Sequence, residues 1–313
     1  MKCHPWLLLG GVALGLIALT LGCGRKPDAG ASAIPRLDQD EFSVMSYNLY
    51  RFGYYDRDED GQADDFKPDE EVSALLAILK ATHPDVLAVQ ELGDEAAFDR
   101  LIALLKEEGL DYPYTQFITG FTPHAKNGLL SRYPLASVTL WTNLTYTVAD
   151  TEVGVSRGFL EATIQVNEDY QFTLFNVHLK SKRFHELGQT EMRRNEARLL
   201  TQLLKDRLEE NPEANLLVVG DMNDEIGSAP LRLILEEGGV TDLLLRDYVG
   251  DIWTHEWTYR QSYSRIDYLF CSPGMLAELV PEKSSVVRHP QNRKASDHRP
   301  LLGVFKASEQ PRK

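Results

Sequence analysis

The chain has 313 residues and a formal net charge of −14 at pH 7, with 47 acidic residues against 33 lysines and arginines. This excess of acid argues against a broad basic surface of the kind that binds nucleic acid tightly without sequence preference. The length allows one large α/β domain with a full core. Beyond its N-terminal segment, the chain shows no change in composition and no internal repeat that would divide this domain.

The first 22 residues are typical of an export signal. Lys2 gives a positive start, residues 6–22 carry no charge, and residues 20–23 read Thr-Leu-Gly-Cys, as in a bacterial lipobox. The uncharged stretch is short for a span and broken by glycines, which favours cleavage; an uncleaved anchor or an ordinary signal peptide is the alternative. We therefore expect Cys23 to carry lipid outside the cytoplasm. Gly24, which is not aspartate, favours the outer membrane over the inner one, and a periplasmic or secreted protein is the alternative.

Residues 23–40 are polar and contain proline and glycine, so we expect a flexible tether after the lipid-attachment cysteine. The domain is expected to span residues 41–306, with a loose tail at 307–313. Cys271 is the only cysteine within this domain. That excludes an intramolecular disulfide and predicts a small buried residue at this position.

Apolar runs and helical patterns are interspersed along the domain, and the strands outnumber the helices. Strands are predicted at residues 43–48, 86–90, 129–131, 159–166, 172–178, 216–223, 265–270 and 301–305. Helices are predicted at residues 69–81, 98–110, 189–209 and 230–236. This order fits an α/β (α+β) fold of two packed sheets flanked by helices better than a single doubly wound sheet.

Polar side chains follow several of these apolar runs, at the points where the strands end. Residues there lie at the edge of a rigid sheet, where side chains from distant segments can converge. Carboxylate and amide oxygens together with imidazoles favour a divalent-cation site for phosphoester chemistry. The residues concerned are Asn48, Glu91, His178, Asp221, Asn223, Asp267, Asp297 and His298.

In this order the residues resemble the motifs of the endonuclease/exonuclease/phosphatase superfamily, which is related to deoxyribonuclease I. The motifs read Met-Ser-Tyr-Asn at 45–48, Val-Gln-Glu at 89–91, Asn-Val-His at 176–178, Gly-Asp-Met-Asn at 220–223, Arg-Ile-Asp-Tyr at 265–268 and Ser-Asp-His at 296–298. The resemblance implies a four-layer α/β/β/α sandwich of two mixed sheets flanked by helices. It also implies metal-dependent hydrolysis of phosphoesters with Mg²⁺ or Mn²⁺.

The resemblance assigns roles to the carboxylates and amides. Glu91 would bind the metal, with Asn48 and Asp297 as helpers in the same shell. Asp221 would act as general base toward the attacking water, and Asn223 would orient that water or bind the phosphate. The alternatives are a strand-end carboxylate that caps a helix for Glu91, and an Asx turn for Asp221 and Asn223.

The two histidines are expected to act on the phosphoryl group or the leaving group. His178 would donate to a phosphoryl oxygen or assist the leaving group. The resemblance pairs His298 with Asp267, whose carboxylate would fix the tautomer of the imidazole and favour its charged form. A structural histidine and a plain turn aspartate are the alternatives.

Two further residues match segments of the family that contact substrate. Arg157 corresponds to a position that binds substrate phosphate, with a surface salt bridge as the alternative. Asn127 lies in another family-like segment. Lys180, Lys182 and Arg183 form either a local positive rim or a solvated loop.

Residues 56–65 have carboxylates at alternate positions and a glycine at position 61, like the start of a calcium loop of EF-hand type. Lys67 stands where the last glutamate of a complete hand belongs, so a helix-loop-helix hand is not expected. An acidic solvated insertion is the alternative to Ca²⁺ binding. The candidate ligands are Asp56, Asp58, Asp60 and Asp64.

Together these features predict a monomeric, lipid-anchored, extracytoplasmic nuclease or phosphodiesterase that acts on nucleic acid or a small phosphodiester. The alternatives are a phosphatase or phospholipid phosphodiesterase on the same fold, and then a non-catalytic surface lipoprotein. Four aromatic residues precede Asp267, and we expect core packing for them, with base stacking or acyl-chain contact as alternatives. They are Trp253, Trp257, Tyr259 and Tyr263.

Overall fold

The computed structural model describes residues 36–122 and 124–311. The predicted signal peptide, the lipidation at Cys23 and most of the tether lie outside these residues. The described residues all belong to one compact unit. Within its described residues, none of the helices is long and apolar enough to cross a bilayer.

Two six-stranded mixed sheets form the centre of this unit. The first has the order β17 (Ser285–Val286), β18 (Leu301–Lys306), β1 (Glu41–Phe52), β4 (Val86–Leu92), β6 (Lys126–Ser131) and β5 (Tyr114–Ile118). The second has the order β13 (Thr241–Asp242), β16 (Asp267–Cys271), β12 (Leu216–Asp221), β11 (Gln171–His178), β10 (Phe159–Gln165) and β7 (Leu135–Trp141). Each sheet contains one parallel pair, β1 with β4 and β11 with β12.

Three two-stranded hairpins accompany the sheets. They are β2 (Tyr54–Tyr55) with β3 (Asp65–Phe66), β8 (Thr145–Val148) with β9 (Thr151–Gly154), and β14 (His255–Trp257) with β15 (Ser262–Ser264). None of these short strands is part of the sequence-based prediction.

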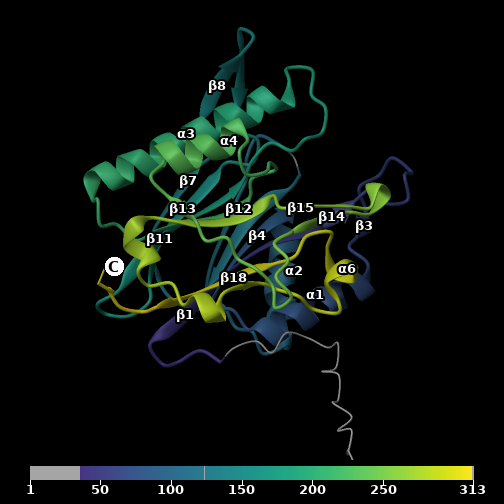
Figure 1. The fold of residues 1–313 in the computed structure, drawn as a ribbon. Helices are drawn as coiled ribbons and strands as arrows, with labels where there is room; N and C mark the ends of the chain where they lie inside the picture. Colours follow the sequence, from purple (N-terminus) through teal and green to yellow (C-terminus); the bar gives the residue numbers. More distant parts are fainter. Residues whose placement is uncertain (1–35, 123, 312–313) are drawn as a thin grey trace, which may run out of the picture. The chain divides into compact units, whose positions relative to one another are not determined.

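The helices lie on the outer faces of the two sheets (Figure 1). Those near the first sheet are α1 (Asp69–Thr82), α2 (Glu95–Glu107) and α6 (Asn292–Ala295). Those near the second are α3 (Gln189–Glu210) and α4 (Ala229–Arg232), which continues as a π-helical turn (Leu233–Glu237). The short α5 (Pro273–Leu276) and the 3₁₀ turns Thr258–Arg260 and Pro281–Lys283 lie in connections. The helix predicted at 98–110 begins earlier than expected, because Asp94 caps it by accepting from the Ala97 amide.

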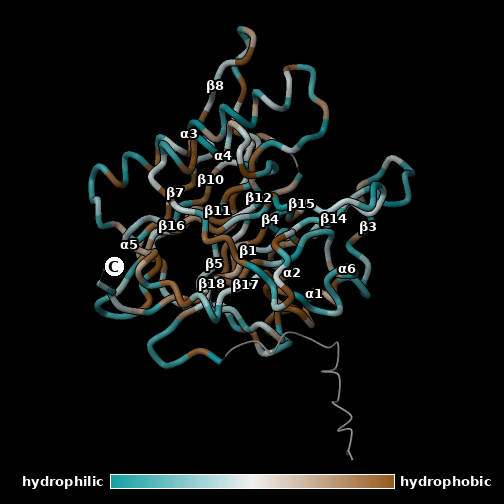
Figure 2. The backbone as a smooth tube through the Cα atoms, in the orientation of Figure 1, coloured by the Kyte–Doolittle hydropathy of each residue, from teal (hydrophilic) through white to brown (hydrophobic). Residues whose placement is uncertain are grey.

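The side chains of β1 alternate between two apolar layers, as the period of two in a strand requires. Phe42 and Val44 belong to the core between the sheets, whereas Met45 and Tyr47 pack on the side of α1 and α2. A third apolar layer, which includes Val218, lies under α3 and α4. Figure 2 shows these hydrophobic segments gathered in the interior strands. The predicted four-layer α/β/β/α sandwich is therefore confirmed.

The core between the sheets becomes polar toward one end. On β1, Asn48 follows Val44 along the inward-facing series. On β4 and β11, Gln90 and Asn176 meet across the gap, where Gln90 Nε2 donates to Asn176 Oδ1 at 2.8 Å. A buried amide pair of this kind keeps its hydrogen bonds while the sheets stay close. The same end of the sandwich carries the predicted site.

The first residues of the predicted loose tail are held in place. The amide of Ala307 donates to Asp40 O, and Asn167 Nδ2 donates to Ala307 O. Asn215 Nδ2 donates to Glu309 Oε1 at 2.8 Å. The segment predicted as a loose tail therefore contacts the domain at Ala307 and Glu309, through side-chain amides from the connections that flank the second sheet.

Candidate active site

The predicted site residues meet where the inner faces of both sheets end. Asn48 and Glu91 lie near the carboxyl ends of the parallel strands β1 and β4, and His178 and Asp221 are paired at the ends of β11 and β12. Asp267 begins β16 and lies opposite Asp221 in the antiparallel ladder. The remaining residues come from the connections before β10 and β18 and after β12; they are Arg157, Asn223, Asp297 and His298.

Asn48 connects the carboxylates of the two sheets. Its Nδ2 lies 3.3 Å from Glu91 Oε1 and 3.2 Å from Asp221 Oδ2, and it donates to both. Its Oδ1 accepts from the amide of Tyr50. The amide thereby stabilises two negative groups at the mouth of the inter-sheet space.

Glu91 and Asn223 both adopt left-handed backbone conformations, with φ of 64° and 51°. Such values are uncommon for residues other than glycine and gather at functional sites. At Glu91 the turn lets Oε2 accept from the amide of Arg51 at 3.1 Å. At Asn223 it lets the backbone amide donate to Asp221 Oδ1 at 2.7 Å. The Asx-type turn expected as an alternative at Asp221 is therefore present, and it orients the carboxylate.

Asp221 is the most strongly perturbed carboxylate of the site. Burial, followed by the negative charge of Asp267, raises the pKa of Asp221 to about 7. The positive charge of His298 and the hydrogen bond from the Asn223 amide oppose this rise. A carboxylate with a pKa near neutrality suits a general base, because it can accept a proton and release it again.

His298 and Asp267 form the closest ion pair of the site. His298 Nδ1 lies 2.8 Å from Asp267 Oδ2, and both side chains are buried. Burial alone would lower the pKa of His298, but attraction to Asp267, helped by Asp297 and Asp221, raises it well above its ordinary value. The amide of Asp267 is itself fixed by donation to Thr254 Oγ1. His298 is thus held as an imidazolium with Nε2 free of Asp267.

His178 has the opposite charge state. Its Nε2 lies 3.4 Å from Asp221 Oδ2, and its Nδ1 has no hydrogen-bond partner within the described residues. Burial, followed by the positive charges of Arg157 and His298, lowers the pKa of His178 well below its ordinary value. One neutral and one charged imidazole therefore flank Asp221.

Arg157 and Asn127 are both buried. Arg157 Nη1 donates to Leu179 O at 3.0 Å, and Asn223 Nδ2 donates to the same carbonyl. No hydrogen bond is found to Arg157 Nε or to either polar atom of the Asn127 side chain in the part of the chain that is described. Arg157 is therefore not a surface salt bridge, and both side chains keep polar atoms available for a ligand.

One residue near the site is absent from the sequence-based set. His255, on β14, places Nε2 at 3.7 Å from Asp297 Oδ2 and stacks near His298, with ring centroids 4.8 Å apart. It follows no apolar run and lies in a hairpin that the sequence does not predict. Only the adjacent bridge between His255 and His298 reveals it.

The oxygen atoms at Glu91 and Asp297 fit a hard divalent cation. Asp297 Oδ1 is buried, and no hydrogen bond reaches it from the described residues. Burial raises the pKa of Asp297, but its interactions with His255 and the charge of His298 outweigh it and leave the pKa lowered. An ionised carboxylate with an unused lone pair is a donor that Mg²⁺ accepts.

The acidic loop between β2 and β3 is exposed. Carboxylate oxygens of Asp56, Asp58 and Asp60 lie within 4.8 Å of one another, and Asp64 does not belong to this group. Asp65 faces inward instead, where Oδ2 accepts from the amides of Arg57 and Asp58. Calcium binding at this loop stays a prediction.

The aromatic residues before Asp267 are not in the core, contrary to expectation. Tyr259 is 90% exposed, and Trp257 and Tyr263 are 49% and 50% exposed. They lie on or beside the β14–β15 hairpin, which is a separate two-stranded sheet outside the two large sheets. Trp253 is partly buried under Arg299, whose guanidinium lies 4.3 Å from the ring.

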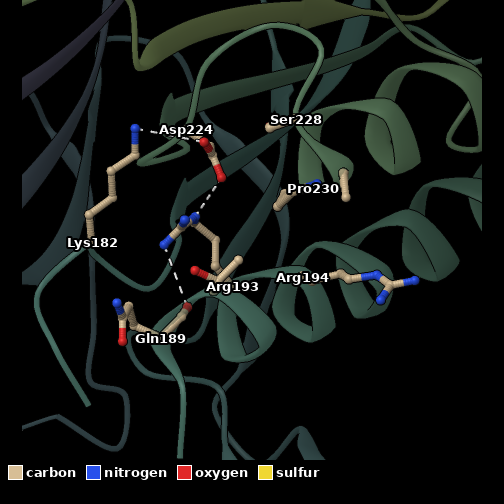
Figure 3. A pocket seen from close by; sticks show the side chains of 9 residues that line it. Lys182, Gln189, Arg193, Arg194, Asp224, Ser228 and Pro230 are labelled. Carbon is tan, nitrogen blue, oxygen red and sulfur yellow. Dashed lines mark hydrogen bonds and ion pairs between the residues drawn. The ribbon is translucent and has the colours of Figure 1, made fainter.

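A cavity of about 470 Å³ opens beside the loop that follows Asp221 (Figure 3). Lys182, Arg193 and Arg194 line it, and Asp224 pairs with the first two. Ser228 also lines the cavity, and its buried Oγ lacks a hydrogen-bond partner among the described residues. Of the residues considered for a positive rim, Lys182 lines this cavity, whereas Lys180 and Arg183 are not among its lining residues.

Solved structures with low sequence identity share this fold. The endonuclease/exonuclease/phosphatase from Beutenbergia cavernae has a TM-score of 0.60 and 19% identity, covering 87% of this chain and 73% of that one. The human Nocturnin catalytic domain has a TM-score of 0.60 and 19% identity, covering 85% and 94%. Beta toxin from Staphylococcus aureus has a TM-score of 0.59 and 17% identity, covering 84% and 99%. These likenesses show the fold.

The sequence itself carries the family assignment. No match to a curated protein is found for the chain. The model of the endonuclease/exonuclease/phosphatase family matches residues 45–298, which include every strand-end residue described above. The chain therefore belongs to the endonuclease/exonuclease/phosphatase family of phosphoester hydrolases.

Proposed function

We propose that the protein is a Mg²⁺- or Mn²⁺-dependent phosphodiesterase whose first substrate class is nucleic acid. The observation that supports it most is the pairing around Asp221. A carboxylate with a pKa of about 7 lies between a neutral His178 and a charged His298. Hydrolysis of a diester needs a base for water and positive charge for the phosphoryl oxygens, and these groups supply both.

In the proposed reaction Asp221 takes a proton from the attacking water, while the turn at Asn223 holds its carboxylate in place. The His298 imidazolium stabilises the phosphoryl oxygens, and Asp267 keeps it charged. Glu91 and Asp297, with Asn48 beside them, would hold the cation, which when bound neutralises charge on the phosphate. Arg157 adds a second fixed positive charge at the same edge.

Two features support nucleic acid as the substrate. Exposed Trp257, Tyr259 and Tyr263 offer faces on which bases stack. Lys182, Arg193 and Arg194 line the neighbouring cavity with a single carboxylate, Asp224, so its lining keeps an excess of positive charge for a flanking phosphate. The same exposed aromatics favour a second candidate, a phospholipid diester, because such rings also enter the polar boundary of a membrane.

One panel of substrates separates these candidates. The protein would be given plasmid DNA, RNA, bis-p-nitrophenyl phosphate, p-nitrophenyl phosphate and sphingomyelin, with Mg²⁺, Mn²⁺ or Ca²⁺ and with or without chelator. We expect chelator-sensitive nicking of plasmid that Glu91→Ala abolishes and that Glu168→Ala, an exposed turn residue, retains. Hydrolysis of the lipid or of a small ester, without hydrolysis of nucleic acid, would make that compound the better candidate substrate. No hydrolysis of any substrate would contradict the proposed enzymatic activity.

We also propose that the protein acts outside the cytoplasm as a monomer, anchored by lipid at Cys23. Residues 1–23 have the charge, apolar stretch and cysteine that such an anchor needs. Fractionation of cells that express the chain or its Cys23→Ser variant tests this. The wild-type chain is expected in the membrane fraction, and loss of the cysteine should release it; retention of the variant would contradict the anchor.

Calcium at the exposed loop is a separate proposal with its own test. Asp56, Asp58 and Asp60 converge, but they also accept hydrogen bonds from nearby amides of the loop. Calorimetry should detect Ca²⁺ binding that an Asp58→Ala, Asp60→Ala variant loses. Equal heats for both proteins would remove the idea.

A further inference from the structure

His255 brings a second imidazole to a carboxylate that already faces His298. His255 Nε2 lies 3.7 Å from Asp297 Oδ2, and His298 Nε2 lies 3.8 Å from Asp297 Oδ1. The ligand atoms of all three residues lie within 4.8 Å of one another. Neither the family motifs nor the proposed reaction uses His255.

These separations suit three ligands of one metal ion. In tetrahedral coordination with bonds of about 2.0–2.1 Å, neighbouring ligand atoms are about 3.3 Å apart. The observed 3.7 and 3.8 Å end on the two different oxygens of Asp297, so the imidazoles flank one carboxylate, and a small rotation of that carboxylate together with a closer approach of the rings would complete the set. Asp297 Oδ1 also has no hydrogen bond from the described residues, so it has a lone pair to give.

The other nitrogen of each imidazole is occupied from outside the cluster. His298 Nδ1 is bound by Asp267 Oδ2, and His255 Nδ1 lies 3.2 Å from Ser264 Oγ. Outer partners of this kind fix the ring and aim the free nitrogen at the metal in protein metal sites. Both free Nε2 atoms face the same carboxylate.

The backbone also fixes the cluster. His255 and His298 form an antiparallel bridge, and the amide of Glu256 donates to Asp297 O at 2.8 Å. The ligands therefore come from two segments that are already joined, so little ordering is needed on binding. A preformed set of this kind binds more tightly than one that must be assembled.

We propose that His255, Asp297 and His298 form a site for a borderline-soft divalent ion such as Zn²⁺, which shares Asp297 with the oxygen-rich position of Glu91. Two imidazoles and one carboxylate leave a fourth position open, as in three-ligand zinc sites. Imidazole nitrogens favour Zn²⁺ over Mg²⁺, whereas Glu91 offers only oxygen. Binding there releases the proton from Nε2 of His298 to solvent and takes that nitrogen away from the phosphoryl group, so Zn²⁺ inhibits.

Calorimetry of the full chain in mild detergent, with excess Mg²⁺ throughout, tests the site. Zn²⁺ would be titrated into the wild type, His255→Ala and His83→Ala. The last variant is the control, because it removes one exposed imidazole elsewhere. We expect His255→Ala to weaken one binding event by about a hundredfold, because loss of an outer partner alone costs roughly 10- to 100-fold. His83→Ala should bind Zn²⁺ with the affinity of the wild type. Zn²⁺ binding by Cys3 and Cys23 is the same in all three proteins, so it does not affect the comparison.

A second readout follows Co²⁺, whose visible absorption strengthens in tetrahedral coordination. The wild type should show this absorption in the presence of Mg²⁺, and His255→Ala should not. If His255→Ala does not fold, Ser264→Ala, which keeps all three ligands, should still weaken Zn²⁺ binding by about tenfold. Two results would overturn the proposal. One is wild-type Zn²⁺ affinity in a folded His255→Ala or in Ser264→Ala. The other is a wild-type chain that binds Zn²⁺ only through its cysteines.

Inhibition is the one arm that rests on the proposed function. Zn²⁺ should lower Mg²⁺-dependent hydrolysis by the wild type over the range where it binds, and His255→Ala should need about a hundredfold more Zn²⁺ for the same fractional loss. Binding without hydrolysis of any substrate would keep the site and remove the function. Hydrolysis without Zn²⁺ binding that depends on His255 would support the proposed function and contradict the Zn²⁺ site.

Discussion

Two buried carboxyl groups at opposite ends of the sandwich share one property and differ in their surroundings. Burial raises the pKa of both Asp221 and Glu278 to about 7. Asp221 lies near the end of the sheets where β18 begins, among two imidazoles and the Asn48 amide. Glu278 lies where β18 ends, since its carbonyl accepts from the amide of Lys306.

The partners of Glu278 are a phenol and a second carboxyl group. Tyr170 Oη donates to Glu278 Oε2, and Glu309 approaches from the tail and raises its pKa further. Cys271 is buried nearby. A phenol and a carboxyl cannot supply the positive charge that a phosphate requires. A raised pKa therefore marks burial in both places, and only the groups around Asp221 turn it into a candidate site.

The largest predicted effect follows directly from this comparison. Asp221→Asn keeps the shape of the side chain but cannot take a proton, so the rate of hydrolysis should fall by about two to four decades. Glu278→Gln removes a carboxyl with the same raised pKa and should leave the rate unchanged. Initial rates on the best substrate of the panel, with circular dichroism as a check on folding, measure both.

Loss of activity in Glu278→Gln, or a wild-type rate in Asp221→Asn, would break the comparison. The first result would mean that the far cluster is coupled to the site. The second would remove Asp221 from the proposed reaction.

The active-site end also contains a buried arginine, Arg157, whose charge acts on His178. Arg157→Ala should lower kcat/KM roughly 10- to 100-fold, because a hydrogen bond to a charged group contributes about 1.5–3 kcal/mol. Arg183→Ala, an exposed residue of the same region, should change kcat/KM little. Steady-state kinetics at several substrate concentrations measures the effect, and equal values for both variants would show that Arg157 acts only on the fold.

The strand-end part of the site could be predicted because its signal is local. An apolar run followed by one polar residue, as at Val219 and Asp221, shows in a few consecutive residues where a strand ends. The family motifs added the order of these ends, and the four layers followed. The geometry that makes Asp221 unusual, such as the turn at Asn223, needed coordinates.

The rest depends on contacts that no local pattern encodes. His255 follows no apolar run and reaches the site only because β14 bridges to the segment at His298. The frequent burial of aromatics predicts Tyr259 in the core, but it lies in the turn between β14 and β15, outside the two large sheets, and is exposed. Glu278 and Glu309 meet only after the tail has folded back along the second sheet.

The smallest predicted effect is a change in stability with pH at the far cluster. The pKa of Glu278 is raised from 4.5 to about 7, by burial first and by Glu309, while Tyr170 opposes the rise. Between these values the folded protein keeps the proton and the unfolded chain loses it, so this residue lowers stability as pH rises from about 4.5 to about 7. Glu278→Gln, which stays neutral and can accept from Tyr170, should remove that fall.

Urea unfolding of the wild type and of Glu278→Gln at pH 4.5 and pH 8 measures this change. The variant should be more stable than the wild type at the higher pH and nearly equal to it at the lower pH. The same difference at both values would mean that the Glu278 carboxyl is ionised in the folded protein throughout. Burial would then not raise the pKa of Glu278, and a raised pKa would be a property of the Asp221 end of the sandwich and not of both ends.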